Sequence, residues 1–77
     1  MNTFHLDLVS SELKIILEAL TEMESRMNNL CEISSDEDEI SEIGNDLVEL
    51  RLLLKPLKEK AINQFGSNIV NFSRELL

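Results

Sequence analysis

The sequence predicts an all-α fold in which two consecutive amphipathic helices form an antiparallel hairpin. Two long stretches place apolar residues at alternating spacings of three and four, which is the period of one face of a helix and excludes the alternation of a strand. Only about four residues, 32–35, separate the two stretches. Because helices joined by so short a connection pack side by side in opposite directions, we expect a hairpin.

The first helix is expected over about residues 6–31. Eight apolar residues follow one another without a break in the 3-4 pattern. They are Leu6, Val9, Leu13, Ile16, Leu20, Met23, Met27 and Leu30. This is the a/d pattern of a coiled coil, so the series predicts the face that packs against the second helix. Met23 and Met27 are accordingly expected to fill the core.

The second helix is expected over about residues 36–65, with the same pattern along Ile40, Ile43, Leu47, Leu50, Leu54, Leu57 and Ala61. Ser34 followed by Glu37 three residues later is typical of a capping box at its start. Gly66 provides a stop at its end. The apolar pattern stays in phase on both sides of Pro56, so we predict an outward-facing kink there and not a break. Gly44 indicates either close approach of a neighbouring helix or local fraying.

A short third helix is expected over about residues 68–76, where Ile69, Phe72 and Leu76 keep helical spacing. A helix of this length is not stable alone, so the segment must pack on other parts of the protein. The pattern leaves open whether it packs on its own hairpin or on a partner chain. The whole chain, residues 1–77, is expected to be one helical-hairpin domain.

The apolar stripes are wider than a two-helix contact requires. Leu17 flanks the first series, while Ile15, Leu52 and Ile62 lie further round the helices. A chain of 77 residues with a single cysteine, Cys31, has neither an internal disulfide nor a Cys/His cluster for structural zinc. Small chains often gain the missing stability by association. We therefore predict a homodimer that forms a four-helix bundle.

Charge is unevenly distributed along this acidic chain, whose formal net charge is -8. Nearly all of the acidic residues fall before residue 51, whereas most of the basic residues follow it. In a hairpin, the acidic turn lies at one end and the Lys55 to Lys60 stretch lies toward the other. A head-to-tail dimer sets opposite charges against each other, so we expect that arrangement. The acidic balance disfavours a nucleic-acid or anionic membrane partner.

The acidic run is the most suggestive polar feature. It comprises Asp36, Glu37, Asp38 and Glu39, followed by Glu42 and Asp46. Carboxylates at helical spacing bind divalent cations in some enzymes, including an all-α nucleotide pyrophosphatase, for which Glu18 and Glu22 are conceivable partners. Glu18, Glu22 and Glu42 are predicted to face solvent, which favours helix capping and solvation over metal binding. Whether residues 36–46 bind a cation stays open.

Other reactive side chains have no companions in the sequence. Cys31 has no basic neighbour that would activate its thiol, so a packed structural role is favoured. His5 is a lone histidine ahead of the first helix. Arg51, Lys55 and Lys58 form a small basic stripe suited to phosphate or an acidic partner, and we expect it to pair with the acidic turn. No catalytic, cofactor-binding or metal site is predicted, and we do not expect an enzyme.

The layout resembles that of Rop-like helical hairpins, which dimerise into antiparallel four-helix bundles and in one case bind paired RNA loops. The favoured function is a small homodimeric protein-interaction module, acting as an adaptor, chaperone or regulator. The alternatives are a Rop-like nucleic-acid-linked regulator and a metal-dependent hydrolase using the acidic stripe of the second helix. No export signal or membrane-spanning run is recognised, so a cytoplasmic location is expected.

Overall fold

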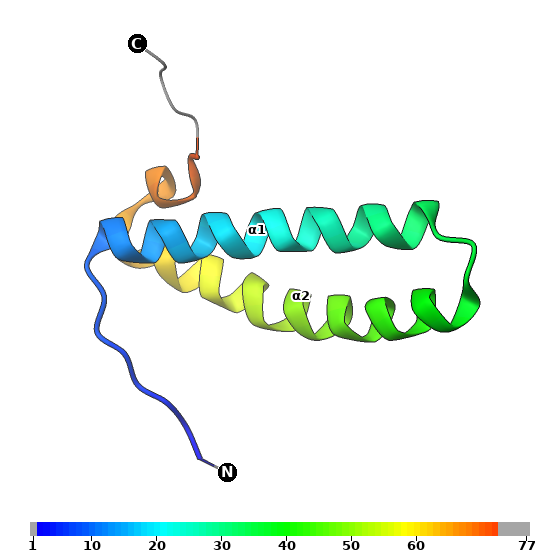
Figure 1. Cartoon of the computed structure of the whole chain (residues 1–77). Helices are drawn as coiled ribbons and strands as arrows, with labels where there is room; N and C mark the ends of the chain where they lie inside the picture. The colour runs from blue at the N-terminus through cyan, green and yellow to red at the C-terminus, as the bar shows by residue number, and fades with distance from the viewer. Residues whose placement is uncertain (1, 73–77) are drawn as a thin grey trace.

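The protein is a hairpin of two long helices followed by one turn of 3-10 helix. The structure, a computed structural model, describes residues 2–72. Its elements are α1 (Ser10–Ile33), α2 (Glu37–Phe65) and η1 (Ser67–Val70). α1 and α2 run in opposite directions and are joined by residues 34–36 (Figure 1). The all-helical hairpin that the two apolar series predict is confirmed.

α1 begins later than residue 6, where the apolar series starts. Leu6 and Val9 are 59% and 61% exposed, so no burial holds the chain before Ser10 in a helical turn. The helix starts where a local hydrogen bond becomes available, because the backbone N–H of Val9 donates to Glu12 Oε1 at 3.0 Å. A carboxylate in this position satisfies one of the N–H groups that a helix start leaves unpaired.

The cap of α2 is Asp36, and the predicted capping box from Ser34 to Glu37 is wrong. Asp36 Oδ1 accepts from the backbone N–H groups of Asp38 and Glu39 at 3.0 and 3.4 Å. Ser34 instead ends α1, and its hydroxyl oxygen accepts from the N–H of Asp36 at 3.3 Å. The aspartate takes the role because it lies immediately before the first helical residue, within reach of N2 and N3.

α2 continues through Pro56, as predicted, and the proline lies on the exposed side of the helix. A bend at this point stays a prediction. The helix ends at Gly66, whose φ of 88° lies in the region that glycine alone adopts readily. The N–H of Gly66 donates to the carbonyl of Ile62 at 2.8 Å and completes the last turn.

The segment after Gly66 is shorter than the helix expected over residues 68–76. Regular structure ends at Val70, because Asn71 already has extended backbone angles. Ile69 is 4% exposed, and Val70 and Phe72 pack against the same core. A single 3-10 turn is therefore enough to pack the apolar side chains of this segment against the hairpin. Leu76, which the prediction included, lies outside the described residues.

The core lies at the open end of the hairpin, where η1 meets both helices. It contains Leu17, Leu54, Ala61 and Ile69. The series predicted for α2 is confirmed, since Leu47, Leu50, Leu54 and Ala61 are all buried. Further along the hairpin toward residues 34–36, the buried side chains are Leu47 and Leu50 of α2.

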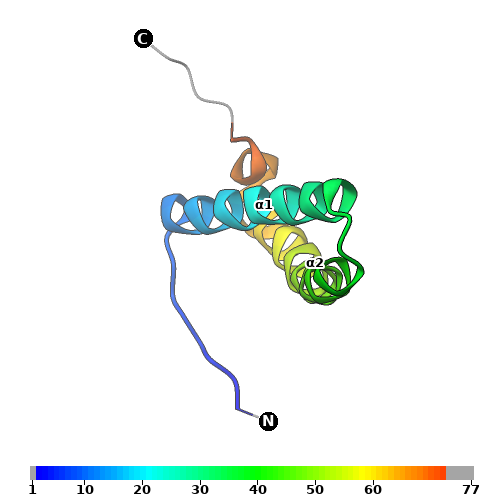
Figure 2. The same cartoon turned by 45° about the vertical axis from the view of Figure 1, so that its right-hand side comes forward.

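The predicted face of α1 is wrong in its rotation about the helix axis. Leu17, which only flanks the apolar series, is fully buried, whereas Met23 and Leu30 of that series are 51% and 37% exposed. Met23 therefore does not fill the core as expected. The physical cause is η1, because Ile69 packs against the same cluster as Leu17 and extends the buried surface round α1. Figure 1 and Figure 2 show η1 and the extended N-terminal segment on opposite sides of α1.

The two glycines allow a matched test of backbone conformation. A methyl group added at Gly44 would meet nothing within 4 Å, so the predicted close approach of another helix is absent from this hairpin. We expect Gly44→Ala to raise the free energy of unfolding by about 1 kcal/mol, because alanine is the better helix former. Gly66→Ala should lower it, because alanine is strained at positive φ. Urea unfolding followed by circular dichroism measures both, and equal effects of the two changes would contradict this assignment.

Two neighbouring residues of α1 test where its core face lies. Leu17→Ala removes a fully buried side chain and should lower the free energy of unfolding by about 2–5 kcal/mol. Ile15→Ala changes a side chain that is 66% exposed and should have an effect of about 0.5 kcal/mol or less. The same urea titration compares the two variants. A larger loss for Ile15→Ala would show that α1 is rotated differently.

Candidate interaction surface

Exposed apolar side chains are the main feature of the surface. In the described part of the chain, twelve large hydrophobic residues are exposed, against six apolar residues that are buried. The exposed set is Phe4, Leu6, Val9, Ile15, Met23, Leu30, Ile33, Val48, Leu52, Leu53, Ile62 and Phe65. Single exposed apolar residues are ordinary, but their grouping into patches marks interaction surfaces. Two groupings follow the geometry of the helices.

The total accessible surface agrees with an incompletely covered hairpin. It is 6496 Å², whereas a compact monomer of 8.8 kDa exposes about 4,800 Å². The extended residues before Ser10 account for part of this difference, and the exposed helix faces contribute to it as well.

The first grouping is a row along α1, here called the heptad row: Val9, Ile16, Met23 and Leu30. These residues recur every seven positions, so Ile16, Met23 and Leu30 form one nearly straight line on α1, and Val9 precedes them as the N-cap residue. Ile16 is half-buried and the other three are exposed. Beside the row, Leu20 and Met27 are half-buried. The row is thus the edge of the apolar stripe that α2 leaves uncovered.

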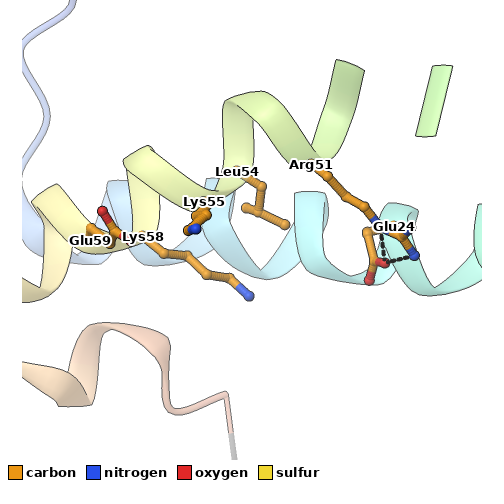
Figure 3. Close-up of a pocket in the computed structure, with 6 residues that line it drawn as sticks. All are labelled: Glu24, Arg51, Leu54, Lys55, Lys58 and Glu59. Atoms are coloured by element: carbon orange, nitrogen blue, oxygen red, sulfur yellow. Dashed lines mark hydrogen bonds and ion pairs between the residues drawn. The ribbon is translucent and has the colours of Figure 1, made fainter. Parts of the chain in front are cut away.

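The second grouping is a depression of about 490 Å³ between the helices, here called the basic-edged groove. Leu54 lies in it, and Arg51, Lys55 and Lys58 of α2 line it together with Glu24 and Glu59. Figure 3 shows Arg51 and Glu24 meeting at one end of the groove and Lys58 toward the other, with Leu54 between them. The groove combines one apolar side chain, the buried Leu54, with three cationic and two acidic ones.

The cationic side chains lie on one edge of the contact between the helices. Each residue of a helix is rotated by about 100° from the one before, so Arg51, Lys55 and Lys58 fall on the same side of the buried Leu54. Leu53 and Lys60 fall on the opposite side. In agreement, Lys60 lines a different depression with Leu57 and the N-terminal segment 6–8. The stripe predicted from Arg51, Lys55 and Lys58 is therefore a real edge, separate from Lys60.

Arg51 is held by α1. Its Nε and Nη2 atoms donate to Glu24 Oε1 at 3.0 and 2.8 Å, and Nη2 also donates to Asn28 Oδ1 at 3.2 Å. The amide nitrogen of Asn28 donates in turn to Glu32 Oε1 at 3.4 Å. Arg51 thus pairs with the middle of α1. The pairing with the acidic turn that the sequence predicted for Arg51 is wrong. Glu24 was not predicted as the partner of Arg51. The only signal in the sequence is its position next to Met23 of the apolar series.

Lys55 and Lys58 differ from Arg51 in making no ion pair with another described residue. Within residues 2–72, the one ion pair is that of Arg51 with Glu24. Lys55 is exposed and Lys58 is half-buried. Both amines lie beside Leu54 in the groove, which Glu24 and Glu59 also line, in a chain whose net charge is -8.

The acidic run does not gather into a site. All six of its residues, Asp36, Glu37, Asp38, Glu39, Glu42 and Asp46, are exposed. No three His, Cys, Asp or Glu side chains in the described part of the chain are grouped so that they could hold a metal ion. Glu22 is exposed and Glu18 is half-buried on α1. What the structure does assign to the run is helix capping, through Asp36 and the acidic first turn of α2.

The remaining reactive side chains lie apart from one another. Cys31 is a half-buried free thiol near the end of α1. His5 is exposed, and its Nε2 atom lies 3.3 Å from the hydroxyl of Thr3 in a hydrogen bond. The structure does not bring either residue to the basic-edged groove.

Comparisons with known proteins give no family. No protein family model, curated protein or solved structure matches this chain. Among the described residues, no helix is both long enough and apolar enough to cross a membrane. The functional argument therefore rests on the two groupings of surface side chains.

The Arg51–Glu24 pair permits a measurement of how strongly it couples α1 to α2. Both side chains are partly exposed, at 51% and 27%, so solvent screens their attraction. A double-mutant cycle of Arg51→Ala and Glu24→Ala should give a coupling energy of about 0.2–1 kcal/mol that falls as sodium chloride is raised. The cycle Arg51→Ala with Glu22→Ala is the control, since Glu22 is exposed and lies outside the groove. A coupling as large for Glu22 would contradict the pairing.

Proposed function

We propose that the protein is a small homodimeric helical protein-interaction module. The observation that carries the proposal is the excess of exposed apolar side chains over buried ones on a single hairpin. A helical surface of this kind is stabilised by packing against further helices, either from a second copy or from another protein. The two groupings provide one surface for each of these roles.

The heptad row forms the dimer interface in this proposal. Rows with a seven-residue repeat pack by inserting side chains between those of a facing helix, as in coiled coils and four-helix bundles. A two-fold axis lets the same row serve both copies, which is the commonest form of homodimer. Leu53 adds an apolar contact from α2, on the edge opposite to the basic stripe. Two hairpins joined in this way form a four-helix bundle.

Charge favours the head-to-tail orientation of the two copies. The acidic run 36–46 lies at the turn end of the hairpin, and Lys60 lies near the open end. A parallel dimer would place two acidic turns side by side, where like charges repel. The head-to-tail dimer places each acidic turn near the partner's open end. Lys60 lies on the edge of α2 that carries Leu53, so it is the lysine best placed to face those acids.

The other function classes have less support. Binding to nucleic acid depends on cations that neutralise phosphates, and this chain has a net charge of -8. A metal-dependent hydrolase needs a grouped set of carboxylates, and the acidic run is spread over exposed positions. An interaction module needs only shape, apolar area and charge placement, which are the properties that the described residues offer.

Oligomeric state and a pair of variants test the dimer. Sedimentation equilibrium at micromolar concentration should give twice the 8.8 kDa mass of the chain. Met23→Lys places a charge within the heptad row and should shift the protein to monomer, because an unpaired charge in an apolar interface is costly. Ile33→Lys makes the same change at a side chain that is 69% exposed and off the row, and should leave the dimer intact.

Circular dichroism of both variants serves as the control that they remain helical. A wild-type monomer at micromolar concentration would overturn the homodimer. Dissociation by Ile33→Lys but not by Met23→Lys would place the interface on another face. Energy transfer between two labelled copies, each with a single cysteine, distinguishes a head-to-tail dimer from a parallel one. One copy is labelled at the turn through Cys31, and the other is labelled at the open end through an added cysteine.

A further inference from the structure

We propose that the basic-edged groove binds an acidic amphipathic helix from a partner protein. The inference rests on the proposed function as an interaction module and adds where the partner binds and which chemistry it carries. Three features support it: Leu54 lies in the groove, two exposed apolar residues of α2 lie in line beside it, and two lysines of the groove make no ion pair with another described residue.

Exposed apolar residues of α2 flank the groove and can contact one face of a helix. Leu54 lies between the cationic side chains, and Val48 and Ile62 stand seven residues before and after Lys55. Val48 is 55% exposed and Ile62 is 37% exposed. Residues at this spacing share one line along α2, which covers about 21 Å at 1.5 Å per residue. A partner helix of about four turns spans that line with apolar residues at i, i+3, i+4 and i+7.

The charged part of the groove selects acidic residues. Arg51, Lys55 and Lys58 are spaced by four and three residues, so like charges are neighbours on the surface of α2. Arg51 is neutralised by Glu24, but Lys55 and Lys58 make no ion pair with residues 2–72. Carboxylates of a partner placed beside these amines relieve the repulsion between them. Glu59 at the edge of the groove repels acids there and restricts the favourable contacts to the Lys55–Lys58 side.

A helix is favoured over a polyanion such as RNA as the occupant. The cations are few, whereas a polyanion gains affinity from many phosphate contacts and would be repelled by the remaining acidic surface. The exposed Val48 and Ile62 would stay uncovered by a phosphate. The groove also lies on the edge of α2 opposite to Leu53 and the proposed dimer contact. The dimer and the partner helix are therefore bound by different surfaces.

The test uses two synthetic peptides of eighteen residues with leucine at i, i+3, i+4 and i+7. One carries glutamate at the positions flanking the leucines, and the other carries lysine at the same positions. Fluorescence anisotropy of the labelled peptides against the full chain measures the dissociation constants. We expect the glutamate peptide to bind at least about tenfold more tightly than the lysine peptide, with affinity falling as salt is raised. Backbone amide shifts should cluster at Val48, Arg51, Lys55 and Lys58.

Charge reversal within α2 supplies matched variants. Lys55→Glu combined with Lys58→Glu should weaken binding of the glutamate peptide by at least about tenfold, because two favourable contacts become repulsive. Lys60→Glu is the control, since it makes the same change on the opposite edge of the helix and should alter affinity by about twofold or less. Tighter binding of the lysine peptide to the double variant than to the wild type would show that charge at this site selects the partner.

Sedimentation of the same variants separates this inference from the homodimer. If the double variant stays dimeric and loses the glutamate peptide, the groove is the partner site. If the wild type proves monomeric yet binds the glutamate peptide at the groove, the inference stands and the homodimer fails. The inference about the groove would be overturned by equal binding of both peptides, by an equal loss of peptide affinity in Lys60→Glu, or by a preference for a single-stranded RNA oligomer. Dissociation of the dimer by the double variant would also overturn it, because the groove would then hold the second copy.

Discussion

The packing of Leu17 sets most of the other features of this structure. Its side chain has no accessible surface, and it belongs to one cluster with Leu54 and Ala61 of α2 and Ile69 of η1. A pair of helices alone would bury one narrow stripe of each. The 3-10 turn adds a third contact at the open end, and α1 is rotated so that Leu17 reaches both neighbours. That rotation decides which apolar residues stay outside.

The residues left outside follow directly from the geometry. With Leu17 facing the core, the row through Met23 lies about a third of a turn away and is only partly covered. Leu53 lies on the corresponding flank of α2, while Arg51, Lys55 and Lys58 lie on the other flank. The exposed Met23 and Leu53 lie on one flank, and the N-terminal segment 6–8 lines a depression with Lys60 on the same flank of α2.

The two helices differ in how well the sequence predicts their buried face. In α2 the buried residues all belong to the 3-4 series, and the exposed Val48, Leu52 and Leu53 lie outside it. In α1 the apolar residues include both Ile16 and Leu17, and a period alone cannot decide which of two adjacent positions faces the partner. The choice depends on η1, which is a tertiary contact. For the same reason the position of Ile69 was predictable as apolar, but the single 3-10 turn that places it was not.

The candidate site was predictable in composition and not in position. Arg51, Lys55 and Lys58 form a stripe by spacing alone, but their neighbour on α1 depends on the register between the helices. That register is set by the packing of Leu17 against Leu54 and Ala61 and by the short connection 34–36. A shift of one residue along α1 would turn Glu24 away by about 100° and leave Arg51 without its carboxylate.

The register also explains why the charge on this surface differs from the net charge of the chain. Glu24 satisfies Arg51 at one end of the groove, and Lys55 and Lys58 make no ion pair with another described residue. Three cationic side chains and two acidic ones line the groove, although the net charge of the chain is -8. Screening limits the reach of a charge to about 10 Å at moderate salt, so an incoming helix senses the amines of Lys55 and Lys58 more than the distant acidic turn. In the proposed complex, the placement of charge, and not its total, selects the partner helix.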